Sequence, residues 1–509
     1  MVQIKKHQAN TDNQLFINSQ IKRTAKDSLI YLPAMVIPAI TGILLIRVFT
    51  TIFSPQEYGH YQVTLSTFGL IRVFSMVWLA TSVTRFFLKY KLDGSTGLFF
   101  STLFICGLFS AIGMAGFSFG VNFFIFKSKL SPALFSLINL AIAASIFSTI
   151  FEILVMIFRA GLEPKKYSLF WILFSVGKPV VGIALILLFN FRVSAIFWGF
   201  LIVPLALDLI LFFKLDLINQ VRIRNFSKPL FSQIARYGVP FTFSLFAFWV
   251  LSLSDRYLIE FFRGSAEVGY YSVGYIISEK MLNFIYTILM LAAYPIIVDN
   301  WEKYGDRESQ RLITELSRYY FIICTPILAL LVVIPEQMLK IFSSAKFVAG
   351  ARVLPLIAIG VFLNGVCQYV LKGFELHKRS LNVAKLALIA GIINVGLNII
   401  LIPRFGYIGA GISMASAYTV YFMLSVYLVR AEMAWIPPYR SIFNNLISAI
   451  ILTSFLMIST KFIDHQLLII FLIIPIGILI YYFSLLALNE IKKQEIDQGL
   501  KFIHKLFKV

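Results

Sequence analysis

Charged side chains are scarce in this sequence of 509 residues. Only 14% of its residues are Asp, Glu, Lys or Arg, whereas a soluble domain carries about 25%. The weak alternating pattern of a membrane β-barrel is also absent. Instead, apolar runs of about 20 residues recur from Leu29 to Leu488, and each is long enough to cross a bilayer. Because backbone amides in lipid must be bonded internally, these runs predict helices and an all-α polytopic membrane protein.

Cysteine is scarce, and no cleavable leader is expected. Cys106, Cys324 and Cys367 lie inside apolar runs without metal-ligand spacing, so we expect packing residues and no metal site. The first 27 residues are polar and basic, with no short apolar segment before a cleavage site, so we expect the first apolar run to be a permanent anchor. The net charge is +21, and the basic residues are spread over the loops instead of clustering in one motif. This distribution argues against nucleic acid as a partner.

About fourteen spans are predicted, with breaks marked by Pro55, Pro164 and Pro437. Lys and Arg in the N-terminus, the even-numbered loops and the C-terminus outnumber those in the odd-numbered loops by about three to one. This bias predicts a multi-pass protein of the cytoplasmic (inner) membrane with both termini in the cytoplasm. The predicted spans are residues 28–53, 59–88, 97–126, 133–158, 167–189, 194–213, 237–262, 268–298, 317–334, 351–371, 382–402, 406–429, 441–460 and 466–489.

Two turn motifs occur twice at nearly the same offset. SPQEYGHY at 54–61 matches GSAEVGYY at 264–271, and GLEPKKYS at 161–168 matches GFELHKRS at 373–380. The repeats predict two pseudo-symmetric six-helix lobes plus two C-terminal helices, an organisation typical of transporters. The predicted parts are a cytoplasmic N-terminal segment 1–27, an N-terminal lobe 28–213, a cytoplasmic linker 214–236, a C-terminal lobe 237–430, helices 13 and 14 in 431–489, and a basic cytoplasmic tail 490–509.

Several ionisable residues fall inside the predicted spans, where they are costly and usually face a cavity. The cations exceed the nearby anions, which indicates an anionic ligand such as phosphate. The alternatives are pairing within the protein, for example of Arg72 or Lys178 with Glu152 or Glu279, and, for Arg85, extension to the inner surface. The candidate cations are Arg72, Lys178, Arg256, Lys280, Arg47 and Arg85, and the candidate carboxylates are Glu152, Asp255 and Glu279.

Groups that would supply energy from a nucleotide, or catalysis, are missing from the sequence. There is no phosphate-binding P-loop, no nucleophile–base pair and no mid-span histidine. We therefore expect no enzyme activity and no bound cofactor, and an H⁺ or Na⁺ gradient acting through Glu152, Asp255 or Glu279. The amides of Asn394 and Asn398 in the predicted span 382–402 would hydrogen-bond sugars or join helices.

The motif at 54–61, TRF at 84–86, and DRY at 255–257 followed by EVGYYS at 267–272 resemble the polysaccharide-unit flippases (O-antigen or teichuronic type). That family belongs to the multidrug/oligosaccharidyl-lipid/polysaccharide exporter superfamily, and the resemblance covers the first twelve spans. It implies alternating-access transfer of a polyprenyl-pyrophosphate-linked oligosaccharide from the inner to the outer leaflet, with the candidate cations binding the pyrophosphate. Membrane lipids and a polysaccharide polymerase would be its partners.

Three other functions remain open. The first is a lipid II-type flippase, in which the last two helices help to form a lipid groove. The second is an ion-coupled multidrug exporter of the same superfamily, for which an acidic cavity is expected. The third is a membrane enzyme such as a polysaccharide polymerase or ligase, which would need a large outer loop, whereas the longest one predicted here is 335–350.

Overall fold

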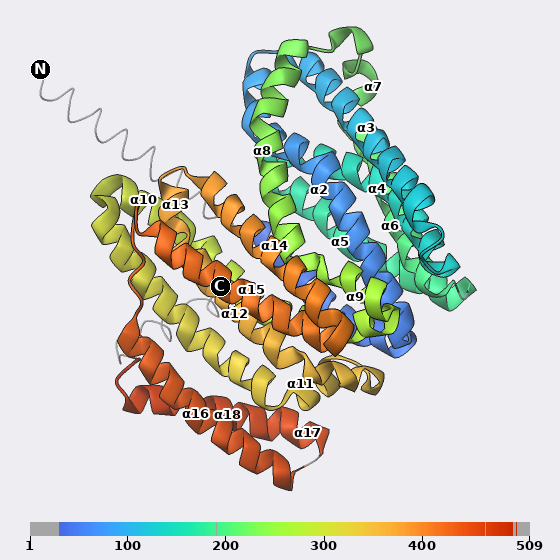
Figure 1. Cartoon of the computed structure of the whole chain (residues 1–509). Coiled ribbons are helices and arrows are strands. Elements are labelled where there is room, and N and C mark those ends of the chain that lie inside the picture. Colours follow the sequence, from blue (N-terminus) through green and yellow to red (C-terminus); the bar gives the residue numbers. More distant parts are fainter. Residues whose placement is uncertain (1–29, 190, 464, 492–494, 496–509) are drawn as a thin grey trace, which may run out of the picture. The chain divides into compact units, whose positions relative to one another are not determined.

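The computed structural model describes residues 30–189, 191–463, 465–491 and 495 (Figure 1). Within these residues the chain is helical apart from short turns, and thirteen helices are long and apolar enough to cross a membrane. The predicted all-α polytopic class is thereby confirmed. The predicted N-terminal segment 1–27 and nearly all of the tail 490–509 lie outside the described residues.

The described chain divides into two compact units. Unit 1 comprises the residues up to Leu45 and Thr64–Phe243, and unit 2 comprises Ile46–Val63 and the chain from Ser244 onward. The boundaries fall inside helices, so the first helix, Ile30–Ile52, and helices α2 and α8 each contribute to both units. For this reason the units do not end where the predicted lobes 28–213 and 237–430 end.

Unit 1 is built mainly from long apolar helices with proline-marked starts. Pro55, Pro132 and Pro164 each open a helix, where the missing amide hydrogen costs no hydrogen bond. The helices are α2 (Pro55–Leu92), α3 (Thr96–Val121) with a π-helical turn (Asn122–Phe126), α4 (Pro132–Ala160), α5 (Pro164–Phe189), α6 (Arg192–Lys214), α7 (Leu217–Gln220), a 3₁₀ turn (Ile223–Asn225) and α8 (Lys228–Leu253).

Unit 2 holds the remaining helices, and its last two long ones, α16 and α18, pack against each other as a hairpin (Figure 1). The helices are α9 (Asp255–Arg263), α10 (Ser265–Val333), α11 (Pro335–Phe342), a 3₁₀ helix (Ala345–Arg352), α12 (Leu354–Val370), α13 (Lys372–Leu376), α14 (Ser380–Phe405), α15 (Tyr407–Val429), α16 (Tyr439–Phe462), α17 (Gln466–Leu468), a π-helical turn (Ile469–Ile473) and α18 (Ile474–Ala487).

Two segments outside the predicted spans contain helix. The predicted loop 299–316 is helical, because α10 continues through it with one sharp break at Gly305, where φ is 73°, a conformation that favours glycine. The predicted span 268–298 lies mostly in the first part of α10, which carries Glu279 and Lys280 and is not among the thirteen apolar helices. The predicted linker 214–236 is also partly helical, since α8 already begins at Lys228.

The repeated motifs meet where α2 and α10 begin. A Cβ atom on Gly59 would overlap the backbone of Ser265, and one on Gly269 would overlap the backbone of Pro55. These two contacts are equivalent under the repeat offset, so the helix starts cross reciprocally, as in a contact with two-fold symmetry. At the first start, Ser54 and Glu57 form a capping box, in which the Ser54 amide donates to the Glu57 carboxylate over 2.9 Å.

Candidate functional site

The first candidate site lies in unit 1 and is formed by α2, α4 and α5. Arg72 of α2 forms an ion pair with Glu152 of α4, which is the internal pairing considered from the sequence. The Glu152 side chain is only 1% exposed, whereas that of Arg72 is 28% exposed. The guanidinium therefore retains an accessible surface while its partner is fully enclosed.

Lys178 of α5 is buried beside this pair and is held by aromatic rings. Its ammonium lies 3.5 Å from the ring centroid of Phe174 and 4.7 Å from that of Phe200, a geometry in which the ring faces attract the cation. No carboxylate of the described residues forms a salt bridge with it. The Arg72 guanidinium lies 5.5 Å from the Phe68 ring, which itself meets Phe200 edge-on.

Close packing of α5 against α6 fixes the position of Lys178. A Cβ atom on Gly182 would come within 2.8 Å of the Ile196 Cα atom, and one on Gly199 would overlap the Lys178 carbonyl. Small residues of this kind let membrane helices approach closely. The sequence signal for this arrangement, the two glycines near Lys178 and Phe200, was not used in the prediction.

Basic side chains outnumber carboxylates in this cluster. Two basic side chains, Arg72 and Lys178, lie near a single buried carboxylate, that of Glu152. A buried cation without its own counterion is expensive in a membrane. The arrangement therefore favours an anion that contacts the exposed part of Arg72.

The second candidate site lies in unit 2, at the start of α9. Asp255 is fully buried and accepts hydrogen bonds from the Tyr271 hydroxyl and, over 2.6 Å, from the Asn398 amide. Asn398 also donates to Asn394 over 2.7 Å. The Asn residues on α14 thus join helices through a carboxylate, one of the two roles expected from the sequence.

A junction between two helices positions Asp255. The Ser254 hydroxyl donates to the Val250 carbonyl over 2.5 Å, and such bonding to the residue four positions earlier bends helices. α8 ends at Leu253 and α9 begins at Asp255, while the Ser254 backbone between them keeps helical angles, with φ −64° and ψ −28°. The two helices therefore continue one another, with Asp255 at their junction.

Two further candidate cations of unit 2, Arg256 and Lys280, have partners close to them in the sequence. Arg256 is buried, lies 4.7 Å from the Tyr275 ring centroid and donates to the Ser252 carbonyl over 3.3 Å. Lys280 pairs with its neighbour Glu279 over 3.3 Å, and both side chains are about one-third exposed. Arg256 also interacts electrostatically with the buried carboxylate of its neighbour Asp255.

The two remaining candidate cations lie elsewhere. Arg47 donates to the carbonyl oxygens of Lys340, over 2.9 Å, and Ser343, so it caps the C-terminal end of α11, as cations commonly do. Arg85 is exposed on α2. Unit 1 thus contains Arg72, Lys178 and Arg85, and unit 2 contains Arg47, Arg256 and Lys280.

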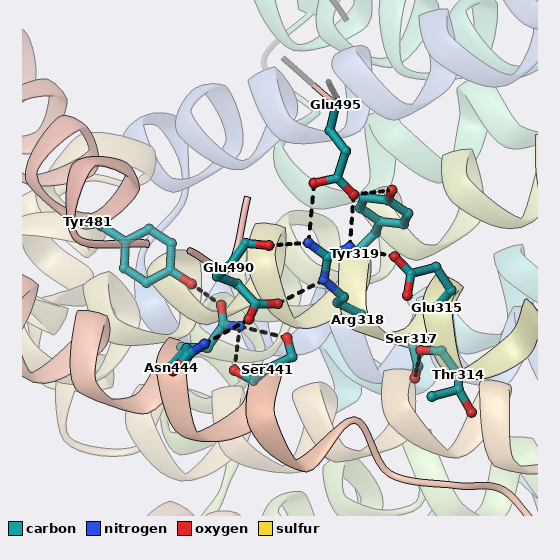
Figure 2. A network of polar contacts seen from close by, with 11 residues as sticks. Thr314, Glu315, Ser317, Arg318, Tyr319, Ser441, Asn444, Tyr481, Glu490 and Glu495 are labelled. Atoms are coloured by element: carbon teal, nitrogen blue, oxygen red, sulfur yellow. Dashed lines mark hydrogen bonds and ion pairs between the residues drawn. The ribbon is translucent and has the colours of Figure 1, made fainter. Parts of the chain in front are cut away.

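Sequence analysis missed a buried polar network around Arg318 in unit 2 (Figure 2). Arg318 of α10 bonds to Glu490 over 2.8 Å and to Glu495 over 2.9 Å, and also pairs with Glu315. Asn444 of α16 donates to Glu490 over 2.9 Å. The network joins α10, α16 and the segment after α18. The sequence signal for it was Arg318, which lies in an apolar run three residues after Glu315.

These features define a polytopic helical membrane protein whose fold is similar to that of two solved membrane proteins. The structure of lipid II flippase MurJ in an inward closed conformation matches with a TM-score of 0.71 at 14% identity, over 90% of this chain and 98% of that one. An inward-facing MATE family multidrug resistance transporter of the MOP superfamily matches with a TM-score of 0.59 at 14% identity, over 79% and 95%.

The chain belongs to the polysaccharide biosynthesis protein family, whose model matches residues 24–301. This finding confirms the resemblance seen in the turn motifs. The probable flippase AglR of Haloferax volcanii is 22% identical over 65% of this chain and 69% of its own length. An uncharacterized membrane protein of Methanocaldococcus jannaschii is 23% identical, and the match spans only 40% of each chain.

Proposed function

We propose that this protein is an alternating-access flippase that moves a polyprenyl-pyrophosphate-linked oligosaccharide from the inner to the outer leaflet of the cell membrane. The observation that carries the proposal is that two basic side chains, Arg72 and Lys178, lie near one buried carboxylate, that of Glu152. Family membership supports a role in polysaccharide assembly, and the fold supports transport. A polysaccharide polymerase would receive the product.

In this proposal the pyrophosphate competes with Glu152 for Arg72. The guanidinium is the accessible member of the ion pair, and its planar fork can hold two phosphate oxygens at once. Lys178, whose ammonium lies at the ring faces of Phe174 and Phe200, adds positive potential near Arg72. The pyrophosphate is released when Glu152 pairs with Arg72 again. The same ion pair therefore serves both binding and release of the substrate.

Energy would come from an ion gradient that acts through Asp255. Its carboxylate is enclosed by Tyr271 and Asn398 at the junction of α8 and α9, a place where either a proton or Na⁺ would change the local charge. Glu152 and Glu279 are the other two candidates, and both already pair with a cation. The geometry therefore favours Asp255 as the coupling group.

The decisive experiment measures flipping in proteoliposomes that contain a fluorescent polyprenyl-pyrophosphate-linked oligosaccharide. Arg72→Ala should abolish flipping, and Arg72→Lys should retain part of it, because the charge survives while the bidentate geometry is lost. Lys89→Ala, at an exposed position on the same helix, is the matched control. Lipid II and a cationic drug are tested alongside, and transport of either one in place of the oligosaccharide would assign one of the alternative functions.

Coupling is tested in the same proteoliposomes with imposed proton or Na⁺ gradients. Asp255→Asn should make flipping independent of the gradient while headgroup binding is retained. Asp299→Asn, at an exposed position on α10, should leave the gradient dependence unchanged. Full gradient dependence in Asp255→Asn would show that this carboxylate has only a structural role.

A further inference from the structure

Unit 1 contains an apolar groove that is separate from the Arg72 and Lys178 cluster. Its volume is about 750 Å³, within the range of small-molecule sites, roughly 300–1,000 Å³. Helices α2, α3 and α8 and the 3₁₀ turn before α8 form its walls. Its lining includes Trp78, Cys106, Phe109, Ile223, Phe231 and Val239.

The polar atoms in the groove are already bonded to one another. The Trp78 indole N–H donates to the Ser110 hydroxyl over 3.3 Å, and that hydroxyl donates to the Ser75 carbonyl over 2.9 Å. A ligand inside the groove would therefore meet mainly hydrocarbon and aromatic surface. Such a surface fits an alkyl chain and does not fit a sugar or a phosphate.

The walls of the groove continue onto an apolar outer surface. Phe109 and Ile112 of α3 and Phe243 of α8 are each more than half exposed. In a membrane protein, exposed apolar residues on long spanning helices contact lipid. An apolar surface of this kind suits contact with acyl chains.

The loop at one end of the groove is basic. Ile223 lines the groove and is 85% exposed, and Arg222 and Arg224, also exposed, stand on either side of it in sequence. Within the described ranges no carboxylate pairs with either arginine. A hydrocarbon groove beside a loop that carries two exposed arginines matches an amphiphile with an anionic head.

The loop that carries Arg222 and Arg224 is held in place by hydrogen bonds to α3. The Arg222 amide donates to the Ser101 hydroxyl and the Ser227 amide to the Thr102 hydroxyl, each over 3.0 Å. Both hydroxyls belong to the buried face of α3. The loop that carries the arginines is therefore anchored, and the site needs little ordering when a ligand binds.

We propose that this groove is a binding site for an anionic phospholipid, with an acyl chain between α3 and α8 and the phosphate against Arg222 and Arg224. The proposal is independent of the transported substrate, because the groove shares no residue with the Arg72 cluster. A basic residue near an anionic lipid surface contributes about a five-fold preference. The two arginines together are thus expected to give at most about 25-fold selectivity over a zwitterionic lipid.

The test uses the full chain in nanodiscs with phosphatidylglycerol or phosphatidylcholine carrying a photoreactive diazirine in the acyl chain. Mass spectrometry should find adducts of the glycerol lipid in residues 105–110 and 231–239, several-fold above those of the choline lipid. The double variant Arg222→Gln/Arg224→Gln should remove this preference. The control Lys127→Gln/Lys129→Gln removes an equally exposed basic pair elsewhere in unit 1 and should keep it.

A second variant separates the groove from the general lipid surface. Ala235→Trp fills the groove and should remove the adducts of both lipids, whereas Ile112→Trp, at an exposed position on α3, should not. Equal labelling by both lipids in the wild-type protein would overturn the proposal. So would displacement of the glycerol lipid by an equimolar polyprenyl phosphate, which would assign the groove to the substrate's tail. Each variant must elute as a monodisperse peak in size-exclusion chromatography.

Discussion

A buried lysine held by aromatic rings, such as Lys178, is a poor choice for stability alone. Cation–π contacts with Phe174 and Phe200 offset only part of the cost of removing the ammonium from water. Because no salt bridge to Lys178 exists among the described residues, a hydrophobic residue of similar size there would leave no paired carboxylate behind and would remove the cost of burying a charge. The retention of this lysine therefore suggests a functional demand on its charge.

We expect Lys178→Met to leave thermal stability unchanged or raised, while flipping in proteoliposomes falls at least ten-fold, since loss of even about 1.4 kcal/mol of binding has that effect. The measurements are thermal unfolding in detergent and the flipping assay on the same preparation. Lower stability together with normal flipping would contradict the argument and make Lys178 a packing residue.

Arg318 shows the opposite behaviour, because its charge is satisfied on all sides. Arg318→Met would leave the Glu490 carboxylate, 4% exposed, without its cation, and removing one member of a buried pair costs roughly 3–5 kcal/mol. We expect a large fall in the unfolding temperature. Arg311→Met, on the same helix but at an exposed pair, should have little effect, and adding Glu490→Gln to Arg318→Met should recover part of the loss.

At the scale of elements, the crossing of α2 and α10 depends on two glycines that the repeat places equivalently. A methyl group on Gly59 or Gly269 would enter the backbone of the opposite helix, and backbone cannot move aside as a side chain can. We expect Gly59→Ala and Gly269→Ala each to destabilise the protein by roughly 1–3 kcal/mol or more.

The control for the crossing is Gly116→Ala in α3, where an added Cβ meets nothing within 4 Å. This change should stabilise the helix by about 0.5–1 kcal/mol, because alanine loses less backbone entropy. Unfolding temperatures of the three variants in one detergent provide the comparison. Equal effects at all three positions would mean that the crossing is looser than the structure indicates.

For the whole molecule, the untested prediction is the topology. Single cysteines at Gln56 and Lys346 should react with a membrane-impermeant maleimide from outside the cell, and those at Lys165 and Arg307 only after permeabilisation. The background is a variant without Cys106, Cys324 and Cys367, all of which are buried. Labelling of all four positions from the same side would refute the arrangement with both termini in the cytoplasm.

Much of the architecture was predictable because lipid imposes simple rules on a chain. Long apolar runs such as those now seen in α4 and α15 have one stable backbone form in a bilayer. The turn repeats also carried real structural information, since Gly59 and Gly269 meet where the two repeats begin. Helix boundaries were harder to predict where charged residues lie inside a helix, as Glu279 and Lys280 do in α10.

The sequence by itself determined the helical membrane class, the family resemblance and the set of costly charges, because each depends on composition or local pattern. Only the tertiary structure decided which charges are paired. Arg72 pairs with Glu152, eighty positions away, Asp255 with Asn398, and Arg318 with Glu490. Partners so distant in sequence are brought together by helix packing, in which small residues such as Gly182 and Gly199 set the approach. Packing also gives the two cations different roles. Arg47 caps α11, whereas Lys178 forms no salt bridge with a carboxylate of the described residues.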